Sequence, residues 1–302
     1  MSEVVARQSP WGPLVVADAH VHFFSHRFFA ALASQKPGLT ADAIIAQLGI
    51  QAPAEDPEKF AGVWAHELDR HQVARAALIA SVPGDESSTV AAARAHPDRF
   101  FAYAMANPRA WNAADFEQVD AACLFPAMHR FSMHDAEVQP ILDWAERHHR
   151  LVFVHCGVLS VGIRGKLGLP SPFDMRYSNP IDLHAVALRH PTVHFVVPHF
   201  GAGYFREALM LADLCPNVYL DTSSSNRWMR FQVDAHLDLR HVFRRALDVA
   251  GARRLLFGTD SSLNGWNARI FEEQSTALYE IGVSEADARS IFGENLLRII
   301  AR

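Results

Sequence analysis

The sequence has few cysteines, no excess of basic residues and no long apolar run, and each shortage excludes a class of protein. Its three cysteines, Cys123, Cys156 and Cys215, lie in apolar stretches, which is typical of buried thiols in a reducing compartment. No stretch is apolar for long enough to span a bilayer, so we expect no membrane partner. Residues 1–11 lack the apolar core of a signal peptide, and we therefore expect a cytoplasmic protein.

The charge balance argues against nucleic acid as the main partner. The 33 Asp and Glu residues outnumber the 28 Lys and Arg residues, and the formal net charge of -5 leaves no basic tract for phosphates. Internal repeats and low-complexity linkers are also missing. With 302 residues, half of them hydrophobic, we expect a single domain over residues 1–302 with a substantial core and a small-molecule substrate as its partner.

Eight short apolar runs alternate with amphipathic ones along the chain. The strand-like runs lie at residues 14–22, 76–82, 101–106, 121–125, 151–155, 194–199, 218–222 and 255–259. The helix-like runs lie at residues 57–72, 87–96, 113–119, 136–149, 180–189, 203–214, 235–250 and 266–281. Doubly apolar strands separated by helices predict an α/β fold with a parallel sheet, and eight such units predict a closed (β/α)8 TIM barrel. The alternative is an open doubly wound sheet, which the missing glycine-rich turn after the first strand disfavours.

Two segments lie outside this alternation. Residues 24–62 are long for a strand-to-helix connection, and we expect them to cover the barrel mouth or to form the interface of a homodimer. Residues 291–300 have the apolar spacing of a helix, which we expect to pack on the barrel exterior.

Four of the predicted strands end in side chains that bind metals. His20 and His22 are two residues apart and therefore point to the same face, while His155, His199 and Asp260 each end another strand. The carboxyl ends of barrel strands meet at the catalytic end, so these side chains should converge there. Taken singly, the histidine pair could be hydrogen-bonded in the core and Asp260 could cap a helix. Their shared position favours a metal centre.

These motifs resemble those of a known family. The sequence is similar to the amidohydrolase superfamily, and to the branch called amidohydrolase-2, which holds lactonases, related hydrolases and non-oxidative decarboxylases. The resemblance covers essentially the whole chain and is carried by Asp18-x-His20-x-His22, His155, Pro198-His199-Phe200-Gly201, Gly258-Thr259-Asp260 and Gly293-Glu294-Asn295-Leu296-Leu297-Arg298.

The resemblance implies a role for each residue of the centre. One divalent metal, expected to be zinc, would be bound by the ligand set His20, His22, His155 and Asp260. Asp260 would also take the proton of the metal-bound water. His199 would act beside the metal as a polarising or acid–base residue, although it is itself a ligand in some relatives. Asp18 would sit behind the ligands and orient an imidazole.

Cys123 bears on the number of metals. Binuclear members of the superfamily carry a carboxylated lysine or a glutamate on strand four, and Cys123 falls at that place here. A thiolate can bind zinc, but the apolar surroundings favour an inert thiol. We therefore expect one metal per chain.

Positive charge after the fifth strand indicates an anionic substrate. Arg164, Lys166 and Arg176 lie on that loop and could clamp a carboxylate, or they could be ordinary solvated charges. Arg227, Trp228 and Arg230 could line the same mouth. The segment Asp221-Thr222-Ser223 ends the seventh strand and could hydrogen-bond the substrate or nearby loops.

The sequence supports two reactions. The first is metal-dependent hydrolysis of a small, anionic amide or lactone by a metal-activated water. The alternative is metal-dependent, non-oxidative decarboxylation of an aromatic or unsaturated acid. A third hypothesis, a catalytically silent metal-binding or scaffold protein, is disfavoured because a scaffold has no need of an acid–base histidine beside the metal.

Overall fold

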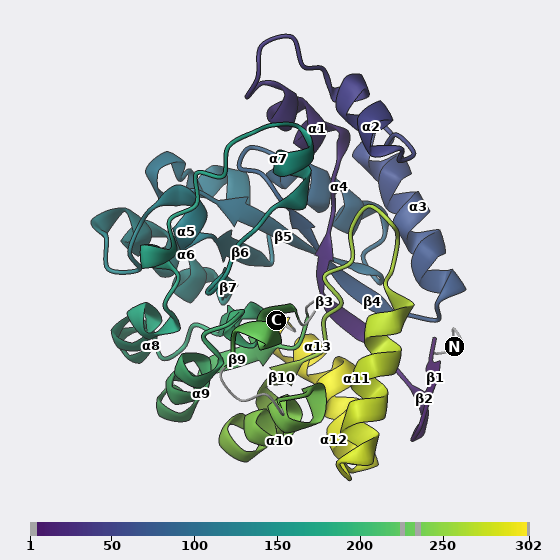
Figure 1. The fold of residues 1–302 in the computed structure, drawn as a ribbon, viewed down its shortest axis with the longest axis vertical. Coiled ribbons are helices and arrows are strands. Elements are labelled where there is room, and N and C mark those ends of the chain that lie inside the picture. Colours follow the sequence, from purple (N-terminus) through teal and green to yellow (C-terminus); the bar gives the residue numbers. More distant parts are fainter. Residues whose placement is uncertain (1–4, 224–226, 233–236, 301–302) are drawn as a thin grey trace.

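The strands form a barrel at the centre of the molecule (Figure 1). The computed structural model describes residues 5–223, 227–232 and 237–300. Within these residues, one eight-stranded sheet runs in chain order, and every neighbouring pair is parallel. Its strands are β3 Ala17–His22, β4 Arg75–Ala80, β5 Phe100–Ala106, β6 Ala121–Leu124, β7 Leu151–Val154, β8 Phe195–Val197, β9 Val218–Asp221 and β10 Leu255–Leu256.

The sheet closes between its last strand and its first. The N–H of Ala19 donates to the carbonyl of Phe257 at 2.8 Å, and the N–H of His22 donates to the carbonyl of Ser261 at 2.8 Å. The closing bonds lie mostly beyond β10, because that strand is only two residues long. The predicted TIM barrel is thus confirmed, and the open doubly wound sheet is wrong.

Helices surround the strands on the outside of the barrel (Figure 1). Their starts follow local chemistry: α3, for example, has Asp56 as its N-cap and Pro57 at its first position. The helices are α1 His26–Ala33, α2 Ala41–Leu48, α3 Pro57–Arg70, α4 Glu86–Ala95, α5 Pro126–His129, α6 Gln139–His148, α7 Gly162–Lys166, α8 His184–Arg189, α9 Phe205–Leu214, α10 Leu239–Ala250, α11 Ala268–Glu280, α12 Glu285–Arg289 and α13 Asn295–Ile300.

Several predicted boundaries need correction. The predicted strand 14–22 is interrupted, because Leu14 belongs to a separate antiparallel hairpin of β1 Arg7–Ser9 and β2 Gly12–Leu14. The predicted helix 113–119 is a single 3-10 turn, Ala113–Phe116, since Asn112 closes the chain locally by accepting from the N–H of Ala114. Residues 235–236 of another predicted helix lie outside the described residues, and α10 begins after its N-cap, Asp238.

The C-terminal segment closes the barrel interior from one end. It divides into a π-helical turn, Ser290–Glu294, and α13. Ile291 and Phe292 pack in the layer between the sheet and the outer helices. Leu296 and Ile299 instead join the cluster of inward-facing strand residues. The predicted exterior packing is therefore wrong for α13, because its apolar side chains have the open end of the barrel to fill.

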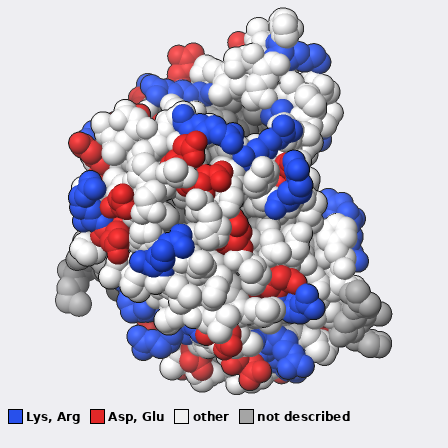
Figure 2. All heavy atoms as spheres, turned by 90° about the vertical axis from the view of Figure 1, so that its left-hand side faces the viewer, with Lys and Arg blue, Asp and Glu red and all other residues white. Residues whose placement is uncertain are grey.

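The long segment after β3 covers the other end. Its helices α1 and α2 pack through Phe29, Ile44 and Ile45 against Leu167 and Leu169, which follow the α7 turn. This confirms that residues 24–62 cover the mouth, while their use as a homodimer interface stays a prediction. In the face shown in Figure 2, acidic and basic side chains are interspersed. Among the described residues, no helix is long and apolar enough to cross a membrane.

Candidate metal centre and active site

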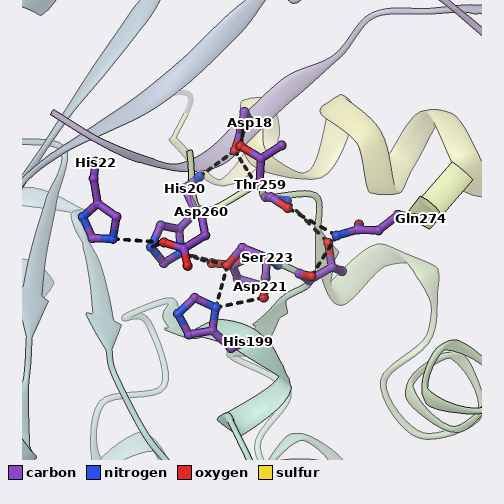
Figure 3. Close-up of polar contacts among 11 residues, drawn as sticks. Asp18, His20, His22, His199, Asp221, Ser223, Thr259, Asp260 and Gln274 are labelled. Atoms are coloured by element: carbon purple, nitrogen blue, oxygen red, sulfur yellow. Dashed lines mark hydrogen bonds and ion pairs between the residues drawn. The ribbon is translucent and has the colours of Figure 1, made fainter. Parts of the chain in front are cut away.

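Three of the predicted ligands come together at the carboxyl end of the barrel (Figure 3). His20 and His22 project from the end of β3, and Asp260 lies beyond β10, which neighbours β3 where the barrel closes. The ligand atoms of the three side chains all lie within 4.8 Å of one another. The closure of the barrel therefore brings together residues that are 238 to 240 positions apart in the sequence.

Hydrogen bonds behind the two imidazoles decide which nitrogen faces Asp260. His20 Nδ1 lies 2.7 Å from a carboxylate oxygen of Asp221, so Nδ1 is the donor. His22 Nδ1 lies 2.7 Å from the hydroxyl of Ser81, which itself donates to the carbonyl of Ile79. His22 Nδ1 is therefore a donor as well. In the neutral rings, both Nε2 atoms carry lone pairs.

The arrangement of these atoms fits a divalent metal. Asp260 Oδ1 lies 3.1 Å from His22 Nε2 and 3.6 Å from His20 Nε2. His20 Nε2 is buried and has no hydrogen-bond partner among the described residues. Two lone pairs and a carboxylate oxygen directed at one place need positive charge between them. Two imidazoles and one carboxylate are a ligand set of catalytic zinc sites that leave a position open for water.

Asp260 is the most exposed member of this group, with 35% of its side chain exposed, compared with 19% for His22 and 1% for His20. Burial raises the pKa of its carboxyl, but the surrounding imidazoles of His22, His199 and His20 outweigh burial and hold that pKa below its usual range. Its backbone is in the left-handed region, with φ 56°. Such strain in a residue other than glycine is common at functional sites.

His199 lies beside the metal candidates but is held differently. It falls in the turn after β8, with φ 56°, and its ring centroid is 4.9 Å from that of His20. Its Nδ1 donates to the carbonyl of Ser223 at 2.8 Å, so Nε2 is the nitrogen left for the cavity. Burial lowers the pKa of His199, although the charge of Asp260 opposes that effect. The ring is therefore neutral near pH 7 and can accept a proton at Nε2.

His155 follows β7 and lines the same cavity. Its ring stacks on Phe125 at 5.2 Å, and its centroid is 5.3 Å from that of His199. Burial holds the pKa of His155 well below its usual range, and the neighbouring imidazoles of His199 and His20 act in the same direction. Its buried Nδ1 has no partner among the described residues. His155 lies outside the group of His20, His22 and Asp260, so its place in the ligand set stays a prediction.

Asp18 holds the backbone and does not contact an imidazole. Its Oδ1 accepts from the N–H of His20 at 2.9 Å and from that of Thr259 at 3.1 Å, while Oδ2 accepts from the indole of Trp266 at 2.8 Å. Burial raises the pKa of Asp18 to about 6, although these hydrogen bonds lower it. Asp18 therefore ties β3 to the segment that carries Asp260. Its predicted contact with an imidazole is wrong, because Asp221 occupies that place.

Asp221 and Ser223 form the support that the sequence interpretation missed. Asp221 ends β9 and is fully buried, and its other oxygen accepts from the N–H of Ser223 at 2.6 Å. The Ser223 hydroxyl lies 2.9 Å from His20 Nδ1 and 3.0 Å from His199 Nδ1, so it connects the two rings. A Cβ at Gly258 would lie 2.5 Å from Asp221 Oδ1, so glycine is required there. The signal available in the sequence was the position of Asp221, an acidic residue at the carboxyl end of the strand between those that precede His199 and Asp260.

Cys123 lies below this centre and not in it. It packs in the barrel interior among apolar side chains, and burial raises the pKa of its thiol well above the usual range. A neutral thiol is a poor metal ligand. This supports the expectation of one metal, which stays a prediction.

The candidate metal ligands His20, His22 and Asp260 line a cavity of about 560 Å³. Its walls are mostly apolar and aromatic, and the phenyl rings come from the 24–62 segment, the end of β6 and the turn after β9. The lining residues are His20, His22, Phe24, Phe28, Ser81, Met105, Phe125, Met128, His155, Val158, Leu159, Ser160, Val161, Gly162, Ile163, His199, Ala202, Arg227, Trp228, Arg230, Phe231, Asp260, Ser262 and Leu263.

The predicted carboxylate clamp lies elsewhere. Arg164 donates to the carbonyl of Pro170 at 2.9 Å and to Gln35 at 2.8 Å, because α7 turns Ile163 toward the cavity and Arg164 away from it. The guanidinium therefore joins the loop after β7 to the segment of residues 24–62 that covers the barrel mouth. It is not available to a substrate in this arrangement.

The other two cations of that prediction are also outside the cavity. Arg176 pairs with Asp174 at 2.6 Å, with 82% of its side chain exposed, and Lys166 is exposed as well. The structure thus does not bring Arg164, Lys166 and Arg176 to the cavity, and their part in substrate binding stays a prediction. Among the described residues, the cations that line the cavity are Arg227 and Arg230, from the turn after β9.

A family model described as amidohydrolase matches residues 17–300. The chain belongs to the amidohydrolase family. A curated relative is protein FluG of Emericella nidulans, which is 35% identical over 83 residues, or 28% of this chain. The chain spans only 9% of the length of that relative in this match. The resemblance seen in the sequence motifs is thereby confirmed.

Solved structures share the barrel at low identity. A 5-carboxyvanillate decarboxylase from Sphingomonas paucimobilis has a TM-score of 0.62 at 13% identity, covering 95% of this chain and 99% of that one. A probable 2-pyrone-4,6-dicarboxylic acid hydrolase from Acinetobacter baumannii has 0.61 at 13%, with the same coverage. The Novosphingobium aromaticivorans 5-carboxyvanillate decarboxylase, complexed with manganese, has 0.61 at 12% and covers 100% of both chains. The family thus includes both hydrolases and decarboxylases.

Removing single side chains should separate metal binding from chemistry. His20→Ala, His22→Ala and Asp260→Ala should lose most of the metal, because each removes one of the converging ligand atoms. His199→Ala should keep its metal, since Ser223 and Asp221 still hold His20. Elemental analysis of the purified variants gives the metal content per chain, and His155→Ala tests the proposed fourth ligand. A metal-free His199→Ala protein would make His199 a ligand.

Asp221 should control metal affinity although it is not a ligand. In Asp221→Asn, an amide replaces the acceptor of His20 Nδ1–H, so we expect about 10- to 100-fold weaker metal binding. Thr222→Val is the matched control, because the neighbouring Thr222 hydroxyl donates to Gln274 and not to a ligand. Competition with a chromogenic chelator measures both affinities. Equal affinities for the two variants would show that Asp221 has only a structural role.

Proposed function

We propose that this chain is a metal-dependent enzyme that hydrolyses a small carboxylated amide, lactone or similar ester. The observation that carries the proposal is the position of Asp260. Its carboxylate faces His20 and His22 and is also partly exposed to the cavity. A bound divalent metal would lower the pKa of a water molecule toward neutrality and polarise the carbonyl of the substrate. We expect zinc, and the manganese in a structural neighbour makes manganese the second ion to test.

The chain's own residues supply the proton transfers. The low pKa of Asp260 keeps it ionised, so it can accept the proton of an attacking water within the cavity. His199 has Nε2 free for the substrate side, because Nδ1 is committed to Ser223. Nε2 can therefore first take up a proton released by the attacking water and then pass it to the leaving group. Phe125 and Trp228 are buried in the cavity wall and limit water around the reacting bond.

The cavity wall favours decarboxylation as the second candidate. Phe24, Phe28, Phe125 and Trp228 offer flat apolar surfaces that suit an aromatic acid. In that reaction the bond to the carboxylate carbon breaks, carbon dioxide leaves, and a proton takes its place on the remaining carbon. His199 lines the same cavity and can deliver that proton once Nε2 has taken one up from water. The substrate would again be a small carboxylate, so both candidates share the anionic group.

Product analysis decides between the two reactions. The protein is stripped with a chelator, reloaded with zinc or manganese, and incubated with panels of aromatic acids and carboxylated lactones and amides. We expect turnover only after reloading, and His199→Ala should reduce it by about 10²- to 10⁴-fold. Mass spectrometry distinguishes addition of water from loss of carbon dioxide. Turnover that survives complete removal of metal would contradict the proposal.

Arg230 should recognise the substrate anion where Arg164 does not. Arg230→Gln should lower kcat/KM for the acid by about tenfold, because one charge-assisted contact is lost at an exposed position of the cavity wall. A neutral amide analogue of the same compound should be turned over unchanged. Arg164→Gln is the matched control, since Arg164 binds Pro170 and Gln35 instead. Equal losses in the two variants, or equal losses on acid and amide, would exclude this role of Arg230.

A further inference from the structure

A second cavity borders the candidate active site on the side of α3. Its volume is about 270 Å³. It shares part of its wall with the catalytic cavity, and the shared residues are His22, Phe24, Ser262 and Leu263. One of these, His22, is a metal-ligand candidate. A group held in the second cavity would therefore lie next to the metal centre.

The walls of this second cavity are largely apolar. They come from α1, from residues 50–54 and from α3, which lie along one edge of the barrel in Figure 1, and from the loop after β10. Phe29 and Trp64 are fully or almost fully buried there. The apolar lining residues are Phe24, Phe29, Ile50, Ala52, Pro53, Ala54, Phe60, Val63, Trp64 and Leu263. Such a lining favours binding of a hydrocarbon group, because apolar surface is removed from water, and it offers no partner for a charged group.

The two cavities differ in the cations that line them. No Lys or Arg is among the described residues that line the second cavity, and its acidic group is Glu67. The Glu67 carboxylate already accepts from the N–H of Trp266 at 3.0 Å and pairs with Arg70 at 3.2 Å. It has no need of a ligand, and its charge repels a second anion. The catalytic cavity has Arg227 and Arg230 instead.

A short aromatic stack separates the two spaces. The rings of His22 and Phe24 are stacked at 5.2 Å with an interplanar angle of 11°, and Phe24 stacks on Phe28 at 4.2 Å. Phe24 and His22 line both cavities. The Phe24 side chain is therefore the part of the wall that lies between the metal centre and the second cavity.

We propose that the second cavity is the subsite for an uncharged hydrocarbon substituent of the substrate, which passes Phe24. The substrate would then be an amphipathic monocarboxylate. Its carboxylate faces Arg227 and Arg230, its reacting bond lies at the metal centre, and its apolar substituent occupies the space between α3 and residues 50–54. This inference rests on the proposed function for the position of the reacting bond, but the subsite can be tested by binding alone.

The test measures affinity along a series of ligands that differ only in hydrocarbon length. Benzoate and its 4-ethyl, 4-butyl and 4-hexyl derivatives are titrated into the zinc-loaded protein by calorimetry. Each added methylene should tighten binding about fourfold until the cavity is full. In Ala54→Phe and Val63→Phe, the larger side chain takes up the cavity, so this gain should disappear while the affinity for benzoate is kept.

Two controls make the result decisive. Ala46→Phe makes the same change on the exposed face of α2 and should behave like the unaltered chain. Val63 is 56% exposed, so its enlargement should be tolerated even if Ala54→Phe does not fold. The subsite is refuted if affinity does not rise with length, if the rise persists in both filled variants, or if no member of the series binds. Failure of the proposed function would appear separately, as absence of metal-dependent turnover in a protein that shows the predicted binding pattern.

Discussion

The candidate centre depends on the buried hydrogen bond between His20 and Asp221. It joins β3 to β9 at 2.7 Å, and both side chains are almost completely buried. The bond fixes a proton on Nδ1 of His20, which leaves Nε2 as a lone pair facing Asp260. Gly258 permits this approach, because any side chain there would contact Asp221 and His20 together. The tautomer needed for metal binding is therefore built into the packing of the barrel.

The hydrogen bonds that close the barrel also position Asp260. β10 is short, and the chain beyond it is held by Asp18, whose carboxylate accepts from Thr259. Asp260 follows immediately and has the left-handed backbone that turns its carboxylate toward β3. His199 has the same backbone region after β8, so both groups proposed to move protons sit on strained turns. Their positions depend on the strands and do not require support from the mouth loops.

These dependences explain what the sequence could predict. A buried strand has a strict period, so a histidine at its end has a known place once the barrel is recognised, and this holds for His20 and His22. Asp260 lies beyond β10 in a left-handed turn, so the sequence could assign it only to the same end of the barrel. Loop residues have no such period. Arg164 and Arg176 follow the correct strand, yet neither lines the cavity. Arg164 bonds to Pro170 and Gln35, and Arg176 pairs with Asp174. The helix α13 was misplaced for a related reason, because apolar spacing reveals a buried face but not which space it fills.

The charged residues of the two cavities restrict the kind of ligand more than the fold does. The same barrel carries hydrolases and decarboxylases, so the metal candidates alone do not specify a reaction. The cations that line the catalytic cavity are Arg227 and Arg230, while the acidic group of the adjoining cavity is Glu67, already held by the backbone of Trp266. A dicarboxylate would place one charge against an apolar wall near an acid, at a cost that no described cation offsets. The proposed ligand, with one charged end and one hydrocarbon end, meets no such cost, and in the proposed orientation the bond between those ends would lie near His22 and Asp260.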